Sequence, residues 1–207
     1  MITCKDFWNM RARSYDEQVG GIYEEAYRKT VENSLHHLSP GDRVLEFACG
    51  TGIVTFQIAP HVASLQAIDI SDEMVAKAQA KLERAGLDNL TIRQLDLFDP
   101  SLDGQQFDAV MGFNVLCYVE DLPRTLARIR SLLRPGGVFL SATDCLGQGF
   151  SKAGLRKFWK SHTGSMPYVA FFRTKQLEKQ LEKAGFTILE RENLFPAPPN
   201  LFLAGRK

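Results

Sequence analysis

An acidic position and a loop of small residues stand together in the run Glu46-Phe47-Ala48-Cys49-Gly50-Thr51-Gly52. The apolar run Val44–Ala48 that leads into the loop predicts a buried strand, and the glycines predict a tight turn behind it. Ligands of open parallel sheets bind beyond the carboxyl ends of the strands. Small residues at such an end let the main chain approach a ligand, because no Cβ occupies the space. The loop therefore indicates a ligand site.

Two aspartates follow later predicted strands. Asp69 ends a strand and lies about 20 residues after Gly50, where a carboxylate can accept both hydroxyl hydrogens of a ribose. Asp96 follows the next strand and could accept a hydrogen bond from the amino group of an adenine, although turn chemistry with Asp99-Pro100 would also explain it. Together the loop and the acids predict a cofactor that contains a ribose.

A dinucleotide such as NAD or NADP also contains a ribose. The dinucleotide fingerprint, however, places a third small residue after the two glycines, and the corresponding position here is Thr55. A chain of 207 residues also leaves little room for a separate substrate domain. An NAD(P)-dependent oxidoreductase therefore stays as an alternative, together with a non-catalytic module that binds a cofactor.

The elements that must position these residues alternate along the chain. Predicted strands cover 44–48, 64–69, 90–95, 107–113 and 138–142, and predicted helices cover 53–59, 71–85 and 122–133. This alternation requires crossover connections, and hence a parallel sheet with helices on both faces. Near the C-terminus, a predicted helix over 175–184 precedes two strands, 186–190 and 201–204. These two strands should pair antiparallel, because no helix separates them.

Several motifs occur together in this order. They are the loop 46–52, Asp69 through Met74, Asp96-Leu97, Phe107 through Val110, and Leu133 through Gly137. In combination they resemble the motif series of class I S-adenosylmethionine-dependent methyltransferases, over roughly residues 40–145. The run Phe7–Asp16 resembles the N-terminal helix of members that act on small molecules. The resemblance implies a Rossmann-like α/β fold, a doubly wound, seven-stranded, mostly parallel sheet with an antiparallel last strand.

The resemblance also implies how the first part of the site would hold the cofactor, S-adenosyl-L-methionine. Ala48, Gly50 and Gly52 would line its methionine part, and Asp69 would hold its ribose. The run Ala48-Cys49 departs from the glycine and small residue that are commoner in the family. The side chains at these two positions reduce the space along the loop.

The remaining implied positions surround the adenine and the amino group. Ile70 would flank the adenine, Asp96 and Leu97 would contact it, and Phe113 and Asn114 would lie beside the methionine amino group. The same implied cofactor-binding set includes Tyr15, which would close over the site, and Glu46, Cys49 and Met74.

The implied reaction is in-line methyl transfer from the sulfonium to a nucleophilic atom of a small organic molecule. Alignment of nucleophile, methyl carbon and sulfur can supply most of the acceleration, so no catalytic residue is assigned. Asp144 and His162 are candidate bases, and Tyr118 is a candidate either for contact with the acceptor or for packing in a lid. Nitrogen, oxygen, sulfur and carbon nucleophiles all stay open as acceptors, and the composition is compatible with a monomer or a dimer.

Composition excludes several other classes. Twenty-five basic and 24 acidic side chains leave a formal charge of +1, which argues against nucleic acid as a partner. The N-terminus is charged at Lys5 and Asp6 before any apolar run develops, unlike a secretory signal, and no stretch approaches the ~18 apolar residues of a membrane span. The four cysteines lie far apart without a C-x-x-C pair. We therefore expect a cytoplasmic protein without a metal site, whose cysteines fill apolar space.

Positive charge gathers in one segment. Residues 151–183 hold eight basic and two acidic side chains, with several aromatic residues among them. The run Lys152–Lys160 predicts an amphipathic helix that forms a solvated lid, favours an acceptor of aromatic or anionic character, or makes weak contact with an anionic membrane surface. We expect one domain over 1–207, in which a helical cap over 1–38 and an insertion over 145–174 cover the site and select the acceptor.

Overall fold

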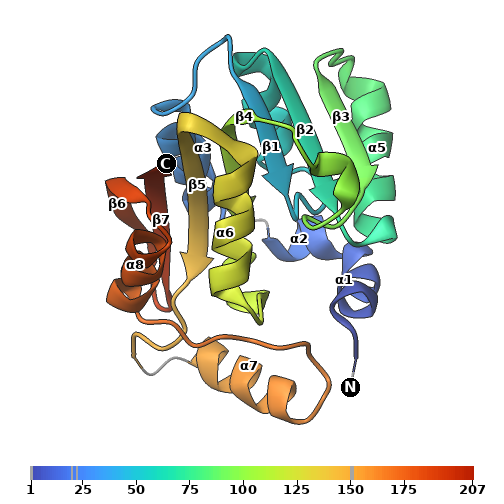
Figure 1. Cartoon of the computed structure of the whole chain (residues 1–207). Helices are drawn as coiled ribbons and strands as arrows, with labels where there is room; N and C mark the ends of the chain where they lie inside the picture. Colours follow the sequence, from blue (N-terminus) through green and yellow to red (C-terminus); the bar gives the residue numbers. More distant parts are fainter. Residues whose placement is uncertain (1, 20, 22, 150–151) are drawn as a thin grey trace.

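The computed structural model describes residues 2–19, 21, 23–149 and 152–207. Its strands form one seven-stranded sheet with the order β3-β2-β1-β4-β5-β7-β6 (Figure 1). They are β1 (Arg43–Phe47), β2 (Ser64–Asp69), β3 (Leu90–Gln94), β4 (Phe107–Phe113), β5 (Leu133–Asp144), β6 (Thr187–Pro196) and β7 (Pro199–Arg206). The pairs from β3 to β5 are parallel, and β7 is antiparallel to both β5 and β6. The predicted sheet with an antiparallel last strand is confirmed.

Helices cover both faces of this sheet. The described helices are α1 (Cys4–Ala12), α2 (Tyr15–Val19), α3 (Glu24–Leu35), α4 (Thr55–Ile58), α5 (Asp72–Ala85), α6 (Leu122–Leu132), α7 (Lys152–His162) and α8 (Thr174–Lys183), with short 3-10 turns η1 (Ala59–His61), η2 (Pro100–Leu102) and η3 (Leu116–Tyr118). One buried cluster joins α3, α4 and α5 to the sheet, and a second joins α6 and α8 to it. The predicted doubly wound arrangement is therefore present.

The helix ends next to the sheet edge follow from local chemistry. The Ser71 hydroxyl accepts a hydrogen bond from the Met74 backbone amide at 3.1 Å, which caps the start of α5, and Gly86 ends this helix with a φ of +63°. The Asp121 carboxylate caps α6 through the Arg124 amide at 3.0 Å. These caps fix where α5 and α6 begin, just beyond β2 and η3.

Three boundaries differ from the prediction. The run Arg134–Gly137, left between the predicted helix over 122–133 and the predicted strand over 138–142, belongs to β5, which begins at Leu133 opposite Phe107 of β4. The helix predicted over 53–59 is shorter, because α4 gives way to the 3-10 turn η1, which contains Pro60. The strands β6 and β7 extend beyond their apolar runs, since their ladder of hydrogen bonds continues up to the connecting turn.

The carboxyl ends of the parallel strands face α1, α2 and α7 (Figure 1). The backbone amide of Ile2 donates to the Gly164 carbonyl at 3.3 Å, and Phe7 shares a buried cluster with Leu146 and Met166. The segment around α7 thus contacts α1, whereas α3 lies along β6 and places Lys29 2.6 Å from Glu192. The predicted caps over 1–38 and 145–174 include residues 1, 20, 22, 150 and 151, which lie outside the described residues.

Candidate functional site

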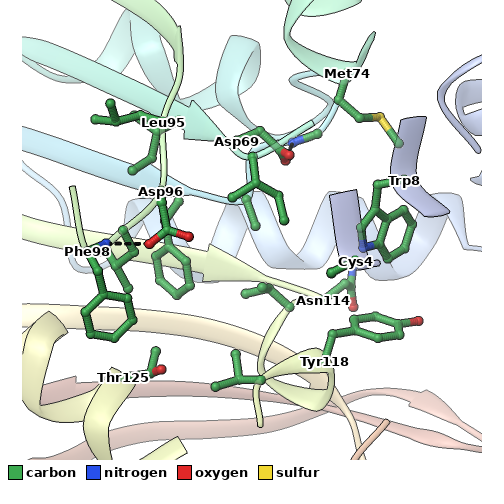
Figure 2. Close-up of a pocket in the computed structure, with 18 of the residues that line it drawn as sticks. Cys4, Trp8, Asp69, Met74, Leu95, Asp96, Phe98, Asn114, Tyr118 and Thr125 are labelled. Carbon is green, nitrogen blue, oxygen red and sulfur yellow. Dashed lines mark hydrogen bonds between the residues drawn. The ribbon is translucent and has the colours of Figure 1, made fainter. Parts of the chain in front are cut away.

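A pocket of about 430 Å³ opens at the carboxyl edge of the sheet (Figure 2). Its wall combines the ends of β1, β2 and β4 with α1, α2, the start of α5 and the start of α6. All the predicted cofactor-binding residues line it except Glu46, Cys49 and Gly52; those in the wall are Tyr15, Ala48, Gly50, Asp69, Ile70, Met74, Asp96, Leu97, Phe113 and Asn114. The predicted site residues therefore converge on one cavity.

The loop after β1 brings main chain to the cavity. Ala48, Gly50 and Gly52 have φ values of +53°, +56° and +83°, a conformation that side chains disfavour. A Cβ on Gly52 would lie 2.6 Å from the ring of Phe56, so only glycine fits there. A Cβ on Gly50 would face Tyr15 at 3.9 Å, which places this tyrosine next to the loop. The strained loop is what leaves backbone groups beside the pocket.

Asp69 is the buried carboxylate of the pocket, with 7% of its surface exposed. Its Oδ2 accepts a hydrogen bond from the Gly50 amide and its Oδ1 accepts one from the Ser71 amide, each at 2.8 Å. Burial raises the pKa of Asp69, while the hydrogen bonds from the backbone amides act in the opposite direction. Each carboxylate oxygen has a second lone pair, so the group can still accept hydrogen bonds from a ligand.

Glu46 lies behind the pocket wall and is 3% exposed. Its Oε2 accepts a hydrogen bond from the Thr55 hydroxyl at 2.7 Å. Burial raises the pKa of Glu46 to about 8, the hydroxyl of Thr55 lowers it in part, and the nearby charge of Asp69 raises it. Thr55 thus occupies the position at which the dinucleotide fingerprint has a third small residue. Its hydroxyl binds the buried carboxyl of Glu46.

The loop after β3 forms the side of the pocket next to Asp69. The Asp96 carboxylate accepts a hydrogen bond from the Phe98 amide at 2.7 Å (Figure 2), whereas Asp99 forms its own turn with the Ser101 amide at 2.8 Å. The Asp99 amide also donates to the Asp96 backbone carbonyl at 3.0 Å, so the turn alternative is right for the backbone, and the Asp96 carboxylate adds a bond to Phe98. One oxygen of Asp96 makes the turn, and the side chain still lines the cavity.

An aromatic wall closes the opposite side. The Trp8 ring meets the Tyr118 ring edge to face, with centroids 5.2 Å apart, and meets the Tyr15 ring at 6.0 Å. Figure 2 shows Trp8, Cys4 and Tyr118 facing the part of the cavity near Asn114. The pocket is thus acidic and strand-based on one side and aromatic on the other.

Asn114 directly follows β4, has a φ of +55° and is held by a polar network. Its Oδ1 accepts a hydrogen bond from Asn200 Nδ2 at 2.7 Å, and its Nδ2 donates to the Tyr27 hydroxyl at 3.3 Å. Asn200 also donates to Asp144 Oδ1 at 2.9 Å, and Asp144 forms an ion pair with Lys157 Nζ at 2.9 Å. The network connects the pocket wall to α7.

The candidate bases occupy different surroundings. Asp144 is committed to Lys157 and Asn200, and His162 lies exposed at the end of α7 beside the Phe158 ring. Tyr118 does line the pocket, and burial raises its pKa well above the usual range, so its hydroxyl stays protonated at neutral pH. The geometry brings Tyr118 into the pocket wall but leaves Asp144 and His162 outside it.

Cysteines contribute no charged group to the site at neutral pH. Cys49, Cys117 and Cys145 are buried, and burial raises the pKa of the Cys117 and Cys145 thiols to about 12. Cys4 lines the pocket as a partly exposed thiol. Across the described part of the chain, no set of three or more histidine, cysteine or acidic side chains gathers as a metal site would require. Nor does any described helix combine the length and apolar character needed to cross a bilayer.

Some lining residues were not predicted. They include Cys4, Trp8, Phe98, Glu120, Asp121, Arg124 and Thr125. Arg124 could have been found from the sequence. It follows the capping residue of a predicted helix, and this helix starts at the carboxyl edge of the sheet. Phe98 follows directly on the predicted adenine contacts. Trp8 lies in the run Phe7–Asp16, whose resemblance implied an N-terminal helix, but no role was predicted for its ring.

Comparison with known proteins agrees with this geometry. Residues 44–137 match a family model described as a methyltransferase domain. The chain is 29% identical over 208 residues to a demethylmenaquinone methyltransferase of Symbiobacterium thermophilum, covering 95% of this chain and 80% of the relative. It is 28% identical to a reducing polyketide synthase of Botryotinia fuckeliana, of which it spans only 8%.

A solved structure gives the same result in three dimensions. The DhpI–SAH complex is 26% identical, covers 98% of this chain and 93% of its own, and superposes with a TM-score of 0.69. The antiparallel last strand, the loop after β1 and the acidic side chains at the end of β2 and after β3 are features that the sequence motifs predicted. The chain belongs to the class I S-adenosylmethionine-dependent methyltransferases.

Proposed function

We propose that this enzyme methylates a small organic molecule, and that the acceptor enters on the side of the pocket formed by Trp8, Tyr15 and Tyr118. The observation that carries the proposal is one continuous cavity with two unlike walls. The strand-end wall has the polar groups that a nucleoside needs, and the aromatic wall has the flat apolar surfaces that an organic acceptor needs.

The residues of the strand-end wall fit S-adenosylmethionine. Asp69 would accept the ribose hydroxyl hydrogens, since each of its oxygens retains an acceptor site. Ile70 and Leu97 offer apolar contact for the adenine, and Asp96 has an oxygen for its amino group. The methionine part would lie along the loop at Ala48 and Gly50, where the backbone reaches the cavity.

Three predicted positions would act from outside the pocket wall. Gly52 permits the turn that places the loop, since Phe56 occupies the space of a Cβ. Glu46 and the buried Cys49 would support the loop from behind.

Met74 lines the wall at the start of α5, and Phe113 and Asn114 would lie beside the methionine amino group. Asn114 is well suited to this role, because Asn200 and Tyr27 fix its side chain.

The bound cofactor supplies an electrophilic methyl group on a sulfonium that is a good leaving group. The protein's part is then to exclude water and to align the acceptor. The edge-to-face contacts of Trp8 with Tyr15 and Tyr118 hold three aromatic side chains in fixed orientations around the acceptor side. Tyr118, held protonated, can donate a hydrogen bond to an acceptor oxygen or nitrogen but does not serve as a base at neutral pH.

The lining favours an aromatic over an anionic acceptor. Glu120 and Asp121 line the rim, and Arg124 is the cation among the described lining residues. The basic side chains of α7 that suggested an anionic acceptor, Lys152, Arg156 and Lys160, are exposed and are not part of the pocket wall. A relative named for methylation of demethylmenaquinone supports an acceptor of this kind.

The test is calorimetric titration with S-adenosylhomocysteine, followed by incubation with the methyl-labelled donor and a panel of phenols, quinones, aromatic amines and carboxylates. We expect binding of S-adenosylhomocysteine and transfer of label to an uncharged aromatic compound. Stabilisation by NAD or NADP, and none by S-adenosylhomocysteine, would support the oxidoreductase alternative. Cofactor binding without transfer to any acceptor would support the non-catalytic module, and transfer to the carboxylates alone would overturn the aromatic assignment.

A further inference from the structure

The outward face of α7 carries an unusual combination of side chains. Lys152, Leu155, Arg156, Trp159 and Lys160 are spaced by three or four residues, so they share one face of the helix. All five are exposed, with 62% of Trp159 and 44% of Leu155 accessible to solvent. An exposed tryptophan and leucine between three cations form an amphipathic surface. None of the described residues of the chain covers this surface.

The charge of this surface is unopposed locally. No aspartate or glutamate occurs between Asp144 and Glu178, whereas the same stretch contains six lysines and arginines. Lys157 is paired with Asp144. The remaining cations of α7, at Lys152, Arg156 and Lys160, are exposed to solvent. The outer face of α7 is therefore a small positive surface with apolar side chains at its centre.

The inner side of α7 is anchored, so the outer face is held outward. Lys157 Nζ lies 2.9 Å from Asp144 and 5.6 Å from the centroid of the Tyr118 ring, and the Phe158 ring packs against Phe171 at 5.7 Å. Figure 1 shows α7 beyond the carboxyl ends of the strands, at the outer limit of the molecule. Because Tyr118 lines the pocket, the outer face of α7 is separated from the pocket wall by little more than the helix itself.

We propose that this outer face of α7 docks the protein on an anionic lipid surface, with the helix axis in the plane of the interface. The argument is charge complementarity together with the apolar centre. Lysine and arginine attract anionic headgroups, while tryptophan and leucine insert at the boundary between headgroups and acyl chains. Tryptophan in particular suits an interface that is apolar at one end and wet at the other. A nucleic acid would use the cations but gives no role to Leu155.

Docking of this kind would place the pocket beside the lipid. Interfacial helices bury their apolar side chains only into the outer part of the bilayer, so the protein stays on the surface. The docking proposal does not depend on the proposed acceptor, because lipid binding is measured without turnover.

The test is co-sedimentation of the 207-residue chain with vesicles of phosphatidylcholine alone and of equal parts phosphatidylcholine and phosphatidylglycerol. We expect the mixed vesicles to bind the protein about tenfold more tightly, and added salt to weaken that binding. The double variants Leu155→Ala with Trp159→Ala, and Lys152→Glu with Lys160→Glu, should each lose most of the binding.

Matched controls separate α7 from general charge and hydrophobicity. Leu189→Ala removes an exposed apolar side chain on β6, and Lys179→Glu with Lys183→Glu reverses the same number of charges on α8. Both should bind mixed vesicles like the wild type. Equal binding to the two vesicle types, wild-type binding by both α7 variants, or an equal loss in the α8 variant would overturn the proposal, as would binding to duplex DNA without binding to vesicles. Unchanged thermal midpoints show that the variants remain folded.

Discussion

The backbone amide of Gly50 donates a hydrogen bond of 2.8 Å to Oδ2 of Asp69. This bond joins the loop after β1 to the end of β2, while Oδ1 of the same carboxylate holds the Ser71 amide at the start of α5. One buried side chain thus fixes three segments at the rim of the pocket. Both oxygens accept hydrogen bonds in this arrangement, which favours the ionised form against the effect of burial.

Asp69→Asn tests this relationship. An amide has one oxygen, so one of the two backbone amides would face an NH₂ group and a ligand would lose an acceptor for its ribose hydroxyls. We expect the binding of S-adenosylhomocysteine to weaken by roughly 1–3 kcal/mol, measured by calorimetry. Glu73→Gln, an exposed carboxylate on the first turn of α5, is the control and should bind normally. Equal affinity of Asp69→Asn and the wild type would show that the ribose contact lies elsewhere.

The rim of the pocket could be predicted from the sequence, and Tyr15 and Tyr118 were candidates for its aromatic wall, but the contact of Trp8 with both tyrosines could not be predicted. Neighbouring parallel strands end at the same edge, so the positions of Gly50, Asp69 and Asp96 along the chain suffice to bring them together. Trp8 meets Tyr118 because α1 folds back over that edge, and no local periodicity encodes the contact. The start of β5 was missed for a related reason: Leu133 is drawn into the sheet by its partner Phe107 on β4, against the turn signal of the residues that follow it.

The ionisation of Glu46 predicts a pH dependence of stability. Burial raises its pKa from 4.5 to about 8, so between these values the folded protein keeps a proton that the unfolded chain has released. The free energy of unfolding should therefore fall as pH rises through this window, by at most about 1.4 kcal/mol per pH unit from this group. Glu46→Gln, which can still accept a hydrogen bond from Thr55, should remove this contribution.

Urea denaturation of the cofactor-free protein at about pH 5 and about pH 8 measures the effect. The wild type should lose more stability between the two conditions than Glu46→Gln does. Glu83→Gln, an exposed position on α5, should behave like the wild type. A Glu46→Gln protein with the same pH dependence as the wild type would show that Glu46 is ionised in the folded state at both pH values.

The Arg124 guanidinium lies 4.4 Å from the centroid of the Phe98 ring, and both side chains line the pocket next to Leu97. The pair stands where we place the adenine, so it should restrict the outer edge of that subsite. Phe98→Ala and Arg124→Ala should each weaken binding of S-adenosylhomocysteine. In the free energy of S-adenosylhomocysteine binding, the loss in the double variant should differ from the sum of the two single losses by about 0.5–1 kcal/mol. This is the range for an exposed cation–π pair. Additive losses would mean that the two side chains act on the ligand separately.

The ion pair between Lys157 and Asp144 predicts how firmly α7 is attached. Both side chains are about three-quarters buried, and Asp144 also accepts a hydrogen bond from Asn200, which in turn holds Asn114. Lys157→Ala would leave this carboxylate without its cation, at a cost of roughly 1–3 kcal/mol in the free energy of unfolding. Detachment of α7 would expose the segment 145–173, so chymotrypsin should cleave this segment faster.

Lys160→Ala, on the exposed face of the same helix, is the control and should change neither the free energy of unfolding nor the rate of cleavage. If the two variants are cleaved at the same rate, α7 is held by its aromatic contacts, such as that of Phe158 with Phe171, and not by the ion pair.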